Sequence, residues 1–145
     1  MTRPPLALPT DVRRAIVAHA RRERPHECCG LLVGDDRQVV AAVPMRNVAE
    51  TPRTRYRIDD REHIALRRSL RDSAADERVV GVYHSHPEGP AEPSARDLAE
   101  AHYPDWLYVI VGFSGDRAHV RGFALEPGRM RPIRLAPPRA GRQGA

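Results

Sequence analysis

The chain contains no lysine, although it carries 24 basic residues, all arginines, among its 145 positions. Aromatic residues are also scarce, at 5%, and no nucleic-acid recognition motif accompanies the arginines, which are spread along the chain. We therefore interpret the formal net charge of +5 as a solvated basic surface, in preference to a nucleic-acid-binding module. Such a surface also suits an acidic protein partner.

Long apolar runs are missing as well. None approaches the roughly 20 residues that a membrane helix needs, and the N-terminal stretch MTRPPLALPTDVRR lacks the continuous apolar segment and cleavage site of a signal peptide. We therefore expect a soluble protein of the cytoplasm that does not associate with membranes. The sequence does not indicate its oligomeric state.

The only cysteines, Cys28 and Cys29, are adjacent. A trans peptide holds their Cα atoms about 3.8 Å apart, which is closer than an ordinary disulfide prefers, so a structural disulfide is disfavoured. Roles as metal ligands or as a nucleophile stay open. The favoured interpretation is that both are small buried residues of a strand.

The apolar pattern and the turn residues predict three helices and seven strands. Helices are expected at residues 10–23, with Thr10 as N-cap, from Asp59 or Asp60 to about residue 72, and from Ser94 until Pro104 stops the helix. Strands are expected at residues 28–34, 38–45, 55–58, 78–86, 106–113, 118–125 and 130–135.

These elements indicate one domain of the α/β or α+β class, built around a mixed central sheet with about three flanking helices. The length is typical of a single domain, and no repeat or linker divides it. We expect the domain to cover residues 1–135. Residues 136–145 have the sequence APPRAGRQGA, which predicts a disordered tail.

Two histidines close the predicted strand at 78–86. His84 and His86 are two residues apart, so both side chains leave the same face of the strand and can converge on one ion. A loop rich in proline follows, and Asp97 falls at the start of the next helix. Two imidazoles and one carboxylate match the three protein ligands of a catalytic zinc, whose fourth position is left to water.

Glu27 and Ser94 are the candidates for the catalytic groups. Glu27 lies at the mouth of the first predicted strand, where a carboxylate can take a proton from water and deliver it to the leaving amine. Ser94 can donate a hydrogen bond to a developing oxyanion. Taken alone, Ser94 and Asp97 are better explained as a helix capping box, S-x-x-D, although the two roles can coexist.

The combination of these residues resembles the JAMM (MPN+, JAB1/MPN/Mov34) metalloprotease motif. His84 and His86 are followed by Ser94 and Asp97 at the H-x-H-x7-S-x2-D spacing, and Glu27 opens the upstream segment ECCGLLVG. Residues 47–59, NVAETPRTRYRID, also resemble short prokaryotic members. The resemblance covers roughly residues 25–113 and implies a JAB/MPN-like domain of cytidine-deaminase-like architecture.

Carried over residue by residue, the resemblance implies one zinc ion per chain on His84, His86 and Asp97, with Glu27 as base and acid and Ser94 as oxyanion stabiliser. It also implies hydrolysis of the peptide or isopeptide bond after the C-terminal Gly-Gly tail of a ubiquitin-fold sulfur-carrier protein (ThiS/MoaD-like), for example the release of cysteine during cysteine biosynthesis. Loop 47–57, with its arginines, could line the channel for this tail or be a plain surface loop.

Two other functions remain open. A general de-conjugating isopeptidase for ubiquitin-like modifiers would share the site and differ only in its substrate surface. A non-catalytic scaffold of the same fold would normally have lost some ligands, and all are retained here, so it is disfavoured.

Overall fold

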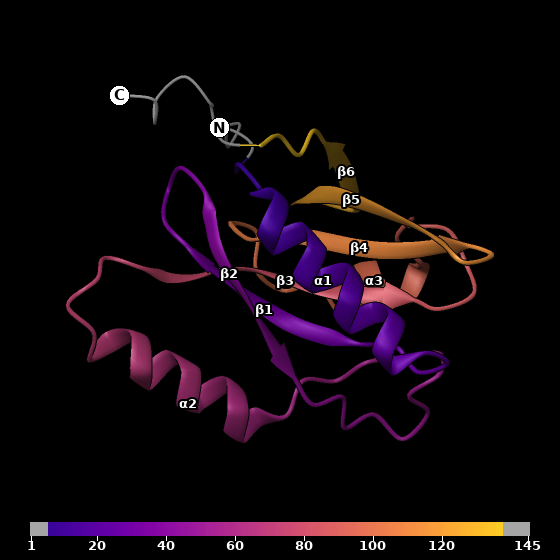
Figure 1. Cartoon of the computed structure of the whole chain (residues 1–145), viewed down its shortest axis with the longest axis horizontal. Helices are drawn as coiled ribbons and strands as arrows, with labels where there is room; N and C mark the ends of the chain where they lie inside the picture. The colour runs from indigo at the N-terminus through magenta and orange to yellow at the C-terminus, as the bar shows by residue number, and fades with distance from the viewer. Residues whose placement is uncertain (1–5, 138–145) are drawn as a thin grey trace.

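A six-stranded mixed sheet forms the centre of the molecule (Figure 1). The structure is a computed structural model, and it describes residues 6–137. The strand order is β2-β1-β3-β4-β5-β6, and only the neighbours β3 and β4 run parallel. The strands are β1 (Cys29–Gly34), β2 (Val39–Met45), β3 (Arg78–His86), β4 (Leu107–Ser114), β5 (Arg117–Glu126) and β6 (Arg129–Ile133).

Three helices accompany the sheet: α1 (Thr10–Glu23), α2 (Asp60–Arg71) and the short α3 (Ala95–Ala99). The sheet has an apolar core on each face. Helix α1 covers the core on the face nearest the viewer in Figure 1, whereas α2 packs against the core on the other face through Leu66 and Leu70. The mixed sheet with three helices confirms the predicted fold class.

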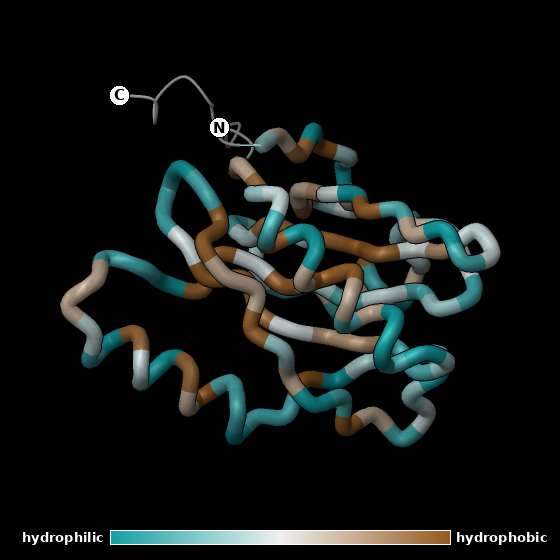
Figure 2. The backbone as a smooth tube through the Cα atoms, viewed as in Figure 1, coloured by the Kyte–Doolittle hydropathy of each residue, from teal (hydrophilic) through white to brown (hydrophobic). Residues whose placement is uncertain are grey.

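Strand β4 shows how the sequence builds both cores. Residues 107–113 are buried in an unbroken run, and their side chains alternate between the two faces of the sheet. Val109 and Val111 pack toward α1, while Tyr108 and Ile110 pack on the other side. Because successive side chains of a strand point to opposite faces, a strand covered on both faces is apolar throughout. Figure 2 shows the apolar residues concentrated along the central strands.

The loop that follows β3 is packed tightly against β4. The Phe113 backbone N–H donates to the Gly89 carbonyl at 2.8 Å. A Cβ atom on Gly112 would lie 2.2 Å from the backbone nitrogen of Ala91, so this approach requires a glycine. The proline-rich loop is thereby held against the strand next to β3, and it returns the chain to the carboxyl end of β3.

Three local predictions were wrong. Helix α1 begins at Thr10, but its N-cap is Pro9 and no side chain caps it. Residues 55–58 form no strand, since only an isolated bridge joins Ile58 to Asn47, whose side chain takes up backbone groups there. Helix α3 ends at Ala99, earlier than Pro104 suggested, and Glu100 is its C-cap.

Most of the expected tail, residues 138–145, lies outside the described residues. Ala136, the first residue of the expected tail, is described, and its carbonyl accepts a hydrogen bond from the Leu8 backbone N–H at 2.8 Å. Among residues 6–137, no helix is long and apolar enough to cross a membrane.

One buried hydrogen bond ties α1 to the sheet, and we expect its loss to be measurable. The Tyr83 hydroxyl lies 2.7 Å from Nδ1 of His19, and both side chains are buried. Replacing Tyr83 by Phe leaves the imidazole nitrogen without its partner, which should lower the free energy of unfolding by about 1–2 kcal/mol. Urea denaturation would measure this change. The half-exposed Tyr103 offers the control: Tyr103→Phe should stay within about 0.5 kcal/mol, and equal stabilities for the two variants would contradict the prediction.

Candidate metal centre

Three side chains converge at the carboxyl end of β3. Nε2 of His84 lies 3.2 Å from Nε2 of His86 and 3.2 Å from Oδ1 of Asp97. Nε2 of His86 lies 3.1 Å from Oδ2 of Asp97. The structure therefore brings together the two histidines and the aspartate that the spacing H-x-H-x7-S-x2-D singled out, as a group that could hold a metal ion.

The distances within this group fit a small tetrahedral cation. Ligand atoms at 2.0–2.1 Å from a tetrahedral zinc are separated by about 3.3 Å. The three separations above are 3.2, 3.2 and 3.1 Å. Nitrogen and carboxylate oxygen are also the donor types that zinc prefers, so this residue set fits the ion.

Neighbouring groups orient both imidazoles. Nδ1 of His86 donates a hydrogen bond to the Pro90 carbonyl at 2.9 Å, which turns Nε2 toward the other two side chains. The ring of Tyr56 stacks on His84, with centroids 4.5 Å apart and an angle of 22°. The tight packing of the loop on Gly112 therefore matters directly to the site, since it holds the carbonyl of Pro90.

Ser94 and Asp97 form the capping box of α3. The Asp97 backbone N–H donates to Ser94 Oγ at 3.0 Å, and the Ser94 N–H donates to Oδ2 of Asp97 at 2.9 Å. The capping interpretation is therefore correct for both residues. It also orients Asp97 toward the histidines, and it uses Ser94 Oγ only as an acceptor, so the hydroxyl proton remains available.

Glu27 is buried beside this group. Cys29 pairs with His84 across the β1–β3 ladder, so their side chains lie on the same face of the sheet. Glu27 comes two residues before Cys29, and alternate residues of an extended chain point the same way, so Glu27 shares this face. Only 7% of Glu27 is exposed. Its backbone N–H donates to the Pro52 carbonyl at 2.7 Å, and its carbonyl accepts from Nδ2 of Asn47 at 3.0 Å.

Burial sets the protonation states of these groups. It raises the pKa of Glu27 to about 7, so this carboxyl exchanges protons near neutral pH. Burial also lowers the pKa of His84, which keeps the imidazole in the neutral form that a metal ligand needs. Burial alone would raise the pKa of Asp97. Its hydrogen bonds with His84 and His86 outweigh this effect and hold the pKa of the carboxyl well below its ordinary value.

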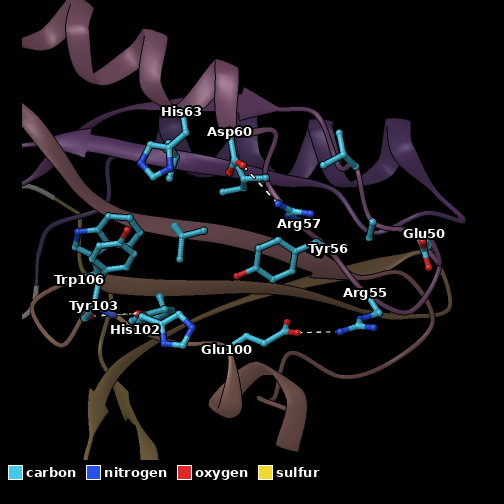
Figure 3. Close-up of a pocket in the computed structure, with 16 residues that line it drawn as sticks. Glu50, Arg55, Tyr56, Arg57, Asp60, His63, Glu100, His102, Tyr103 and Trp106 are labelled. Carbon is cyan, nitrogen blue, oxygen red and sulfur yellow. Dashed lines mark hydrogen bonds and ion pairs between the residues drawn. The ribbon is translucent and has the colours of Figure 1, made fainter.

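A groove of about 610 Å³ runs along the same face of the sheet (Figure 3). Tyr103 and Trp106 stack at one end, with ring centroids 3.7 Å apart. Arg55 and Glu100 form an ion pair at the other end, and Tyr56 lies between the two ends. Since Tyr56 also stacks on His84, the groove adjoins the metal-ligand group.

Several of these residues were missed by sequence reasoning. Tyr56, Asn47 and Glu100 act on the site through contacts with side chains or backbone groups distant in sequence, and no spacing rule reveals such contacts. The cysteines are free and buried. Burial raises the pKa of Cys28 to about 12 and that of Cys29 further, so neither thiol ionises near neutral pH.

Comparison with known families identifies a match over most of the chain. Residues 9–124 match the family described as prokaryotic homologs of the JAB domain. This range is longer than residues 25–113, the part of the chain that carries the resemblance in sequence. It includes the five residues of the motif: Glu27, His84, His86, Ser94 and Asp97.

Relatives of known name align over similar lengths. The desampylase of Haloferax volcanii is 41% identical over 121 residues, which span 79% of this chain and 86% of that protein. The CysO-cysteine peptidase of Mycobacterium tuberculosis is 37% identical over 126 residues, spanning 85% of this chain and 84% of that protein. The solution structure of a protein from Desulfitobacterium hafniense superposes with a TM-score of 0.78 at 28% identity and covers 90% of each chain.

The burial of Glu27 leads to a prediction about the metal-free chain. Because the pKa of Glu27 is raised from 4.5 to about 7 in the folded state, ionising it there opposes folding progressively between pH 4.5 and 7, and fully above pH 7. Glu27→Gln should therefore raise the free energy of unfolding at pH 8 by about 3 kcal/mol, and by little at pH 4.

Denaturant titration with a chelator present, at both pH values, would measure this difference. Glu50→Gln removes an exposed carboxylate and provides the matched control, with an expected change within about 0.5 kcal/mol. A Glu27→Gln variant no more stable than wild type at pH 8 would show that the buried carboxylate carries no such penalty.

Proposed function

The chain belongs to the family of prokaryotic homologues of the JAB domain, and on this basis we propose that it is a zinc metallopeptidase acting on the C-terminal tail of a ubiquitin-fold protein. The substrate is a sulfur-carrier protein (ThiS/MoaD-like), and the bond cleaved follows its terminal Gly-Gly. The observation that carries this proposal is the convergence of His84, His86 and Asp97 beside the buried carboxyl of Glu27.

In this function His84, His86 and Asp97 hold the zinc ion through two imidazole nitrogens and one carboxylate. A zinc ion bound there supplies Lewis acidity, which activates water near neutral pH and polarises the scissile carbonyl. The protein contributes rigidity, because both histidines lie on a central strand and each is oriented by a second contact.

Glu27 moves the proton. A general base works best with a pKa near the working pH, and the pKa of about 7 meets this requirement in the metal-free chain. Its carboxylate accepts a proton from the attacking water and delivers it to the leaving nitrogen. The hydroxyl oxygen ends on the carrier's new carboxylate, and the released group leaves as an amine.

Ser94 stabilises the developing oxyanion. Its oxygen accepts a hydrogen bond from Asp97, which fixes the position of Oγ, and its own proton is free to be donated. The residue therefore caps α3 and donates to the substrate.

The groove beside the site suits an extended peptide. Its lining includes the stacked rings of Tyr103 and Trp106 at one end, Tyr56, and parts of the loop at residues 48–58. An extended tail can use backbone hydrogen bonds for affinity and end at the metal ligands. A relative named CysO-cysteine peptidase supports the release of a single cysteine. A relative named desampylase supports the alternative, general de-conjugation by an isopeptidase.

Cleavage of a defined carrier tests the proposal. A ThiS-like carrier that ends in Gly-Gly-Cys should lose its cysteine when incubated with the zinc-loaded protein, as measured by intact-protein mass spectrometry. A chelator should abolish the reaction and added zinc should restore it. Glu27→Gln should keep its zinc but lose about 10²- to 10⁴-fold in kcat.

A lysine-linked carrier conjugate assayed in parallel separates the peptidase from the isopeptidase. Cleavage of neither substrate would point to a non-catalytic scaffold. A Glu27→Gln variant with full activity and full zinc content would exclude this residue as the base.

The two roles of Ser94 can be separated by substitution. Ser94→Gly removes the hydroxyl, yet glycine is an adequate N-cap, so stability should fall by only a few tenths of a kcal/mol. Loss of the oxyanion donor should lower kcat about 10²-fold. Ser94→Thr retains both functions and serves as the control in thermal melts and steady-state kinetics. Normal kcat in the glycine variant would reduce Ser94 to a helix cap.

A further inference from the structure

Arg55 lies at one end of the groove, and the residue that follows it, Tyr56, stacks on His84. Nη2 of Arg55 lies 3.1 Å from Oε2 of Glu100, the residue that caps the C-terminus of α3 (Figure 3). The side chains are 45% and 42% exposed, so the guanidinium is open to solvent and to a ligand. One ion pair uses only part of the five donors of a guanidinium.

The backbone of Arg55 is fixed relative to Glu27. Nδ2 of Asn47 donates to the Arg55 carbonyl at 2.9 Å and to the Glu27 carbonyl at 3.0 Å. The next residue, Tyr56, stacks on His84. One amide therefore links the arginine to the general base, and one ring links the adjacent residue to a metal ligand.

The ion-pair partner of Arg55 also acts on the site. The charge of Glu100 lies close enough to influence Glu27, Tyr56 and His84. The guanidinium bonded to this carboxylate is one residue along the chain from the ring that stacks on His84, and it adds a second positive charge to that of Arg96, which acts on Glu27.

We propose that Arg55 binds the α-carboxylate of the single residue released from the carrier tail, displacing Glu100 from its ion pair. In a tail that ends one residue after Gly-Gly, the carboxylate carbon lies about 2.5 Å from the scissile nitrogen. A cation at this end of the groove, one residue from the ring that stacks on His84, is therefore placed to recognise it. Guanidinium and carboxylate form a bidentate pair with matched geometry.

Displacement of Glu100 is easy because the existing pair is solvent-exposed, and such pairs contribute little to stability. Arg55 thus makes the protein selective for adducts that end in one free amino acid, and selects against conjugates in which the released nitrogen belongs to a lysine side chain. This inference rests on the proposed function and names the feature of the substrate that the site distinguishes.

Two carriers that differ in one group test it. Both end in Gly-Gly-Cys, one with a free α-carboxylate and one with an α-carboxamide. Wild type should cleave the free acid with a kcat/KM roughly 10- to 100-fold higher. In Arg55→Gln this ratio should fall below about threefold, because the charged donor is lost. Arg68→Gln, which removes an exposed arginine from the last turn of α2, should keep the wild-type ratio.

Binding gives a readout that does not depend on turnover. In the Glu27→Gln background, calorimetry should show the free acid binding more tightly than the amide, and the added Arg55→Gln change should remove the difference. Circular dichroism and zinc content identify any variant that has not folded. For such a variant, Arg55→Lys replaces Arg55→Gln and should keep part of the preference.

The outcomes separate the two levels of the argument. Equal cleavage of acid and amide by wild type overturns the role of Arg55 and leaves the peptidase function standing. A preference that survives in Arg55→Gln also overturns it. Cleavage of neither carrier by zinc-loaded wild type overturns the proposed function and this inference with it.

Discussion

The pairing of β1 with β3 is the interaction on which the site depends. The Cys28 N–H donates to Oγ of Ser85 at 2.8 Å, and the Ser85 N–H donates to the Cys28 carbonyl at 3.1 Å. Ser85 is fully buried between the two histidines of β3, so its hydroxyl bonds to the backbone of the neighbouring strand and not to water. Because Glu27 immediately precedes Cys28, this reciprocal contact sets Glu27 level with His84 and His86. A slip of one residue would turn Glu27 to the opposite face of the sheet.

The aspartate depends on a second constraint, which comes from outside the strand pair. Asp97 is eleven residues beyond His86, and a loop of that length closes reproducibly only if it is held along its course. Packing of residues 89–91 on Gly112 supplies that hold, and the capping box of α3 then turns the Asp97 carboxylate toward the imidazoles. One glycine without a side chain thus positions both the carbonyl that orients His86 and the loop that returns Asp97 to the histidines.

Patterns that repeat locally could be predicted from the sequence, whereas contacts between distant segments could not. Apolar periodicity predicted the six strands and the first two helices because burial is a property of each segment alone. Strand alternation and the motif spacing likewise predicted that His84 and His86 share a face. The strand predicted at residues 55–58 shows the limit of this approach. These residues have strand-like composition, but the Asn47 side chain makes the hydrogen bonds to the Arg55 carbonyl and the Arg57 N–H that a neighbouring strand would make. Tyr56 was missed for the same reason, since only the folded chain shows its ring on His84.

The electrostatics of the site also follow from this arrangement. Glu27, Asp97 and Glu100 place three carboxyls within mutual influence, and the charge of Asp97 adds to burial in raising the pKa of Glu27. Ionising all three carboxyls is unfavourable without a neighbouring cation, because like charges in a poorly hydrated site repel one another. A cation held by His84, His86 and Asp97 would reverse the sign of the local potential and favour an ionised Glu27. Metal binding at this group would therefore be coupled to fold stability and to the protonation of Glu27, and a substitution that alters one of them would alter the others.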